Sequence, residues 1–226
     1  MRIKNGKRVR RILMKEYKKL PITEYLEYAA SSCATPGGGS VASLAGALGA
    51  ALGQMVYNLT YQKKSYQEHD EMTKAVVLSD YKSLVQLQKD LTDLIDRDIQ
   101  AFNTFMDALS MPKSTDEQKE KRRLAMAEAA LIATKVPLET ATKSMEVMRH
   151  LETIARYGHK NCISDAGVAA YLAGAALKSA VLNVRINLPG LEDRDFAEKA
   201  DRTCEALLED SDVLTKEIEM SVAARL

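Results

Sequence analysis

Apolar residues recur at spacings of three and four along most of this chain, which is the pattern of helices that bury one face. The pattern is clearest between about residues 68 and 109, where the repeating apolar positions are Leu84, Leu87, Leu91, Leu94, Phe102, Phe105 and Leu109. No stretch alternates between apolar and polar residues over the length of a strand. The pattern predicts an all-α fold, a single-domain bundle of long helices.

Helix boundaries are predicted from proline, glycine and N-capping residues. The expected helices span about residues 22–33, 40–62, 68–109, 114–157 with a kink or break at Pro137, 165–188 and 193–224. Ser40 and Ser164 are the predicted N-caps of two of them, and the run from Ser114 to Glu117 is a predicted capping box.

The segment from Gly37 to Gln62 contains no charged residue, which raises the question of a membrane span. It is built largely from alanine and glycine, so its hydrophobicity is weak for lipid, and a core helix enclosed by others explains it better. Small residues recur within it at a spacing of four, in the rows Ala42, Gly46, Ala50 and Ala45, Gly49, Gly53. Because a helical glycine costs roughly 1 kcal/mol relative to alanine, these rows predict close approach of another backbone.

One charged residue interrupts the apolar stripe of the 68–109 helix. Asp98 fills the gap between Leu94 and Phe102 in register, so it is predicted to face the interior, whereas Asp96 is predicted to face water. Burial raises the pKa of a carboxyl group toward the range that suits general acid–base catalysis. A purely structural role, with Asp98 paired to a helix end or an arginine, explains the position equally well.

The predicted 165–188 helix has one face that is polar at both ends and small in the middle. This face consists of Asp165, Ala169, Leu172, Ala176, Ala180, Asn183 and Asn187. The two asparagines suit ligand contacts, or hydrogen bonds between helices in the core or at a subunit interface. Together with the small-residue rows, this face predicts a homodimer.

Composition indicates an ordinary globular protein of one large domain, which we expect to be cytoplasmic. The 226 residues are 46% hydrophobic and 28% charged, with a net charge of +1. The three cysteines are too far apart to form a chelating pair, and the three histidines form no HxxxH pair. We therefore expect reduced thiols and no metal site.

Charge is concentrated at the N-terminus, where residues 1–20 hold nine basic residues and a single acidic one, Glu16. Such an arm suits nucleic acid or anionic lipid, but a solvated, disordered leader or a helical extension explains it more simply, as does a true start at Met14. No apolar run follows it, so it is not a secretory signal. We expect neither a nucleic-acid nor a membrane partner, and we assign residues 21–226 to the helical domain.

Two predicted helix N-termini, after Gly39 and after Cys162, could offer backbone N–H groups to an anion or a carbonyl oxygen. The glycine-rich turn lacks the GKS/T of a phosphate loop and follows no strand, so a nucleotide-binding fold is improbable.

Several stretches resemble one known family. Ala34 to Ala42 (ATPGGGSVA), running into Gly49 to Val56 (GAALGQMV), is similar to the opening of the formiminotetrahydrofolate cyclodeaminase / methenyltetrahydrofolate cyclohydrolase family. Three further stretches agree with it in order and spacing: 96–102, 111–113, and 164–165 followed by 183–188. The resemblance covers about residues 22–222 and matches the stand-alone form, without a formiminotransferase domain.

The resemblance implies an all-helical dimer with a folate substrate in a crevice, and an aspartate acid–base residue at the position of Asp98. It implies the cyclodeaminase reaction of histidine degradation, which converts 5-formiminotetrahydrofolate to 5,10-methenyltetrahydrofolate and ammonia without a metal or redox cofactor. The alternatives are the cyclohydrolase, which hydrolyses the methenyl bridge to 10-formyltetrahydrofolate, and a non-catalytic dimerisation module. The candidate substrate-binding residues are Gly37, Gly38, Gly39, Ser40, Ser164, Asp165, Asn183, Arg185, Asn187, Lys63 and Lys64, of which Lys63, Lys64 and Arg185 are expected to attract a glutamate tail.

Overall fold

The computed structural model describes residues 16–226, and within this range every regular element is helical. The α-helices are α1 (Ile22–Ala29), α2 (Gly38–Thr60), α3 (Lys64–Gln67), α4 (Glu71–Leu109), α5 (Asp116–Tyr157), α6 (Ile163–Asn187) and α7 (Arg194–Ala223), with 3₁₀ turns η1 (Tyr17–Lys19), η2 (Lys160–Cys162) and η3 (Leu188–Gly190). The predicted all-α fold is confirmed for the described residues.

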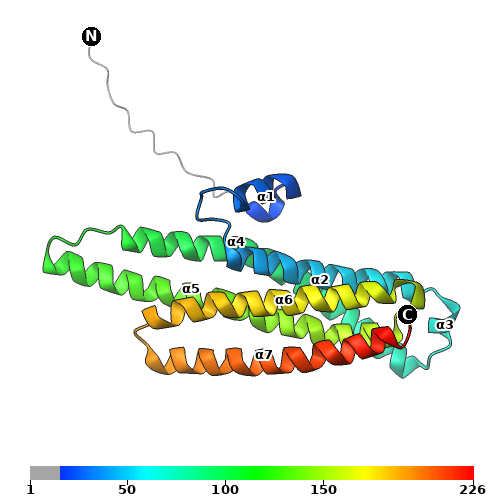
Figure 1. Cartoon of the computed structure of the whole chain (residues 1–226). Helices are drawn as coiled ribbons and strands as arrows, with labels where there is room; N and C mark the ends of the chain where they lie inside the picture. The colour runs from blue at the N-terminus through cyan, green and yellow to red at the C-terminus, as the bar shows by residue number, and fades with distance from the viewer. Residues whose placement is uncertain (1–15) are drawn as a thin grey trace, which may run out of the picture.

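The five long helices run along a common axis, as Figure 1 shows, and α1 lies beside the bundle rather than within it. At one end the hairpin of α4 and α5 extends beyond the other helices, and α3 lies at the opposite end (Figure 1). Helix α2 packs against α4, α5 and α6, and α7 covers α5 and α6. The uncharged segment is thus part of the core, as predicted, but other helices do not enclose it on every side, since Val41, Leu48 and Met55 are exposed.

Two helices, Gly38–Thr60 and Lys160–Gly190, have the length and mean hydropathy of a membrane span. In each case 56% of the apolar window is buried inside the bundle. Their apolar character is therefore accounted for in large part by packing against the other helices.

The predicted N-caps at Ser40 and Ser164 are wrong. Helix α2 begins at Gly38 after Gly37, and α6 begins at Ile163 after Cys162, neither with a side-chain cap. The Ser40 hydroxyl is instead hydrogen-bonded to the Tyr25 hydroxyl at 2.9 Å inside the protein. The capping box that opens α5 lies one residue later than predicted, between Thr115 and Gln118.

Pro137 neither breaks α5 nor divides it, because α5 is one helix from Asp116 to Tyr157. A proline has no N–H, so the carbonyl of Ala133, four residues earlier, has no helical donor. The side-chain amide of Asn187 on α6 donates to this carbonyl at 2.8 Å. The proline therefore creates an acceptor that a neighbouring helix satisfies.

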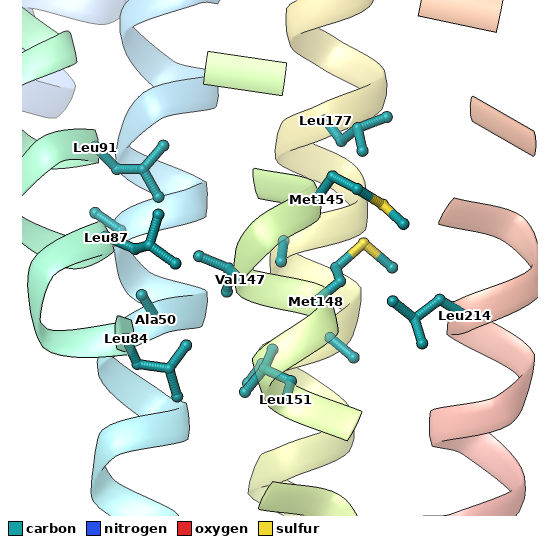
Figure 2. Packing of buried hydrophobic residues seen from close by; sticks show 14 of the residues in the cluster. Ala50, Leu84, Leu87, Leu91, Met145, Val147, Met148, Leu151, Leu177 and Leu214 are labelled. Carbon is teal, nitrogen blue, oxygen red and sulfur yellow. The ribbon is translucent and has the colours of Figure 1, made fainter. Parts of the chain in front are cut away.

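The small-residue rows of α2 make the close contacts that their spacing predicts. A Cβ built on Gly49 would lie 2.8 Å from the carbonyl oxygen of Ala169 on α6, and one built on Gly53 would lie 2.5 Å from Leu151 on α5. Leucine and methionine side chains from α4, α5, α6 and α7 fill the adjoining core, as Figure 2 shows. Close packing of α2 therefore depends on the absence of side chains.

Of the predicted N-terminal leader, residues 1–15 lie outside the described residues. Residues 17–19 form η1, which docks on α4. The backbone N–H groups of Tyr17 and Lys18 donate to Asp96 Oδ1 at 2.7 and 3.3 Å. The last residues of the expected leader are thus part of the folded bundle.

Candidate active site

Asp98 on α4 faces the first turn of α2, which follows the glycine-rich turn. A Cβ built on Gly39 would lie 2.6 Å from Asp98 Cγ, closer than real contacts allow, so glycine is required for the carboxyl to occupy this position. The backbone N–H of Ser40, in the same turn, lies near enough to the carboxylate to lower its pKa. Asp98 thus lies where the free N–H groups and positive end of α2 favour negative charge.

Two opposing effects set the protonation of Asp98. Burial, the larger effect, raises the pKa of this carboxyl, and the Ser40 backbone N–H lowers it, so that the pKa is about 6. A carboxyl group with this pKa can both accept and donate a proton near neutral pH. The prediction that Asp98 faces inward with a raised pKa is confirmed, and no arginine or lysine pairs with it among residues 16–226.

A cavity of about 430 Å³ opens in front of this carboxyl group, between the beginning of α2 and the end of α6. Its polar lining comes from the glycine turn, Asp98 and the two asparagines of α6. Its apolar lining includes Ala101, Phe102 and Phe105 of α4 and Ala130, Ala133 and Pro137 of α5. Cavities of this size with an apolar wall and a few polar groups are the usual form of small-molecule sites.

Asn183 and Asn187 lie on the cavity wall, one turn apart on α6. The Asn183 amide lies against the first turn of α2, since a Cβ on Gly38 would lie 3.3 Å from its nitrogen. Asn187 holds α5 through the Ala133 carbonyl. The asparagines thus line the cavity and also form a hydrogen bond between helices, the two roles that the sequence analysis considered.

The prediction that Asp96 faces water is wrong. Its side chain is only 7% exposed, because η1 covers it and donates two backbone N–H groups to Oδ1. The other oxygen, Oδ2, is buried without a hydrogen-bond partner among the described residues. The covering segment lies almost eighty residues away in sequence, so the periodicity of α4 gives no sign of it.

Sequence reasoning missed Tyr25, the buried residue of α1. Its hydroxyl hydrogen-bonds to Ser40 Oγ, and Ser40 in turn contacts Asp98 through its backbone. Burial raises the pKa of the Tyr25 hydroxyl, and the nearby carboxylates of Asp98 and Asp96 raise it further. No pattern in the sequence indicated this position, since the more apolar Ile22 and Leu26 of the same helix are both exposed.

Five predicted site residues lie elsewhere in this chain. Ser164 and Asp165 are in the first turn of α6, about 28 Å along the helix from Asn183 at 1.5 Å per residue. Lys63 and Lys64, which were expected to attract the glutamate tail of the substrate, follow the C-terminal end of α2 and so lie far from the glycine turn within one chain. Arg185 points to α7, where it pairs with Asp201 at 3.1 Å.

No group of three or more Asp, Glu, His or Cys side chains comes close enough to hold a metal ion within residues 16–226. The three cysteines are free thiols, and the two buried ones lie away from the cavity lining. The chemistry that these residues offer at the cavity is proton transfer at Asp98, next to hydrogen-bonding amides.

The fold and the site define a class of protein: a helical bundle with a carboxyl group of pKa about 6 at the end of a cavity. The family model described as formiminotransferase-cyclodeaminase matches residues 21–206. The chain belongs to this family, as the sequence resemblance indicated.

The chain is similar in sequence to proteins with two different names. A methenyltetrahydrofolate cyclohydrolase from Methylorubrum extorquens is 42% identical over 205 residues, which cover 91% of this chain and 97% of that protein. A formimidoyltransferase-cyclodeaminase from Gallus gallus is 35% identical over 191 residues, which cover 84% of this chain. The matched region is 35% of that longer protein, so this chain spans about a third of its length.

The fold also matches a solved structure. The crystal structure of a formiminotetrahydrofolate cyclodeaminase from Thermotoga maritima aligns with a TM-score of 0.79 at 27% sequence identity. The alignment covers 92% of this chain and 98% of that chain.

Proposed function

We propose that this chain is an enzyme of folate one-carbon metabolism that hydrolyses 5,10-methenyltetrahydrofolate to 10-formyltetrahydrofolate. The observation that carries the proposal is Asp98, a carboxyl group with a pKa of about 6 at the end of a cavity of about 430 Å³. The full-length similarity to a methenyltetrahydrofolate cyclohydrolase favours hydrolysis over the cyclodeaminase reaction that the sequence alone suggested.

In this reaction water attacks the electrophilic carbon that joins N5 and N10 of the folate. The ionised Asp98 carboxylate accepts a proton from the water as the new C–O bond forms. The C–N5 bond then breaks as the proton returns from Asp98 to N5, and the remaining hydroxyl proton is released to solvent, which leaves the formyl group on N10. One carboxyl group is sufficient for both transfers, because it ends the cycle in the state in which it began.

The N-terminal turn of α2 supports this role of Asp98. The Ser40 N–H and the positive end of the helix keep a fraction of the carboxyl ionised despite its burial. The contact with Gly39 restricts where the carboxylate can lie. A base held in position in this way contributes through geometry as well as through its pKa.

The cyclodeaminase reaction is the second candidate, and the similarity to the Thermotoga maritima structure favours it. Here N10 attacks the formimino carbon, the N10 proton passes to Asp98, and the departing nitrogen takes up a proton as the C–N bond breaks. Ammonia leaves and the methenyl bridge remains. Asp98 has the same relay role in both reactions, so the geometry of the site is compatible with either.

The near-ultraviolet absorbance of the methenyl bridge separates the two candidates. With the purified protein, we expect enzyme-dependent loss of this absorbance from 5,10-methenyltetrahydrofolate, above the uncatalysed rate. Appearance of the absorbance from 5-formiminotetrahydrofolate, without the hydrolytic activity, would replace the first candidate by the second. Absence of both activities would contradict the proposed function.

We also propose that the chain forms a homodimer through α2 and α6. The rows of small residues are used within the chain, so they no longer argue for a partner. Exposed apolar residues remain on both helices, namely Val41, Leu48 and Met55 at a spacing of seven on α2, and Val168 and Leu182 at a spacing of fourteen on α6, with the exposed Ala175 midway between them. A seven-residue repeat of exposed apolar side chains is the pattern by which helices pair with one another.

A further inference from the structure

The two asparagines of the cavity use their N–H groups inside the protein. Asn183 Nδ2 donates to the Ser179 carbonyl at 2.8 Å. Asn187 Nδ2 donates to the carbonyls of Ala133 at 2.8 Å and of Asn183 at 3.0 Å. A carbonyl only accepts, so the nitrogen of each amide must face these partners and the amide orientation is fixed.

The oxygen atoms of both amides are left for a ligand. Neither Oδ1 accepts a hydrogen bond from the part of the chain that the structure describes. Neither is sealed in the interior, since Asp96 Oδ2 is the sole buried and unpartnered side-chain polar atom within residues 16–226. Both residues line the cavity, which is therefore the place where a ligand could reach these oxygens.

Asp98 adds a further acceptor when it is ionised, and it lies beside Gly39 just as Asn183 lies beside Gly38. The remaining wall near these groups is apolar, with Phe102, Phe105 and Pro137. A wall of this kind suits a flat ring, and acceptors along one side require hydrogen-bond donors on the ligand, of which ring N–H and amino groups are the ones that lie in the plane of a heterocycle.

We propose that Asn183 and Asn187 select a planar heterocycle by its N–H edge and thereby orient the reacting carbon toward Asp98. This inference rests on the proposed function for the identity of the ring: the pterin of tetrahydrofolate carries a 2-amino group next to a ring N–H. The proline at 137 contributes indirectly, since it frees the Ala133 carbonyl that holds the Asn187 amide in the accepting orientation.

The test compares two ligands by calorimetric titration. One is 5-formyltetrahydrofolate, and the other is its analogue with a methyl group in place of the 2-amino group. The wild-type protein should bind the first about 10-fold more tightly, because the analogue leaves an acceptor of the cavity unpaired. Equal affinity for both ligands, or no binding of the first, would overturn the proposal without any variant.

Asn183→Leu is the variant of choice, because the Ser179 carbonyl keeps the backbone N–H of residue 183 as its helical donor. It should lose most of the 10-fold preference, whereas Asn183→Asp, which keeps the oxygen atoms, should retain a preference for the amino compound. A preference that persists unchanged in Asn183→Leu would overturn the proposal.

Binding is measured independently of turnover, so the two ideas can fail separately. If the protein hydrolyses methenyltetrahydrofolate but shows no preference for the N–H edge, the inference fails and the function stands. If it shows the preference but neither absorbance assay responds, the function fails and the recognition stands.

Discussion

The carboxyl group of Asp98 on α4 lies directly against the Cα of Gly39 in the first turn of α2. The space that a Cβ would occupy is already filled, since it would lie 2.6 Å from Asp98 Cγ and 2.9 Å from Oδ2. The acid–base group and the glycine-rich turn therefore form one structural unit, although they are 59 residues apart in sequence.

Gly39→Ala should inactivate the enzyme more than it destabilises it. The added methyl group displaces the Asp98 carboxyl, and a displacement of about 1 Å can cost about 100-fold in rate. Turnover and thermal unfolding measured on the same preparation test this prediction. Gly174→Ala is the matched control, because its Cβ would meet nothing closer than 3.7 Å, and full loss of activity in both variants would contradict the explanation.

Asp98→Asn should lower kcat/KM by about 10²–10⁴-fold, because the amide keeps the size of the carboxyl but transfers no proton. In the wild-type protein the base must be ionised, so kcat/KM should rise with pH and level off above the pKa of about 6. The variant should lack this bend. Asp107→Asn, on an exposed part of the same helix, should keep both the rate and the pH profile.

The same substitution should stabilise the protein at alkaline pH. The pKa of Asp98 is raised from its ordinary 3.8 to about 6, so the folded state holds a proton more tightly than the unfolded state. The free energy of unfolding therefore decreases as the pH rises from about 4 to above 6, by up to about 3 kcal/mol for this group. Urea unfolding should show Asp98→Asn more stable than wild type at pH 8, with the difference shrinking toward zero near pH 4. A difference in stability between the variant and wild type that does not change with pH would show that it does not come from the titration of Asp98.

Asp96→Ala should release η1. Its carboxylate accepts the backbone N–H groups of Tyr17 and Lys18, and a hydrogen bond to a charged group contributes about 1.5–3 kcal/mol. Hydrogen exchange at these two amides should therefore accelerate by at least about 10-fold. Asp93→Ala removes the exposed ion pair with Lys18 Nζ and should have a much smaller effect. Unchanged exchange in Asp96→Ala would mean that η1 is held by other contacts.

Light scattering at micromolar concentration should give the mass of a dimer. Leu182→Glu should shift the protein to monomer with little loss of helicity, because this side chain is 69% exposed within one chain. Val213→Glu, on α7 and 58% exposed, should leave the dimer intact. A monomeric wild-type protein would contradict the proposed dimer.

Helical periodicity allowed two features of the fold to be predicted from the sequence. The stripe of α4 placed Asp98 correctly, and the charge-free segment identified α2 as a core helix. Asp96 was misplaced because its environment is made by η1, and no local pattern reports a segment that docks from elsewhere in the chain. The predicted cap at Ser40 failed for a related reason, since the Ser40 hydroxyl is hydrogen-bonded to Tyr25 on α1.

The candidate site was predicted in part. The glycine turn, Asp98 and the two asparagines meet at one cavity. Ser164 and Lys63 are not part of the cavity. Ser164 lies at the opposite end of α6 from the asparagines, and Lys63 lies beyond the opposite end of α2 from the glycine turn, in each case about 30 Å away. Tyr25 was not predicted, because a tyrosine on a short amphipathic helix is as consistent with an exposed position as with a buried one.

The cavity draws its lining from four helices, and each contributes only part of the surface around a ligand. The unfolded chain does not bring these segments together, so a ligand of the cavity binds the folded state and not the unfolded state. By mass action, a ligand at 100 times its dissociation constant then adds about 2.7 kcal/mol to the free energy of unfolding. The melting temperature of this protein is consequently a gauge of ligand occupancy, which allows compounds to be ranked without any catalytic assay.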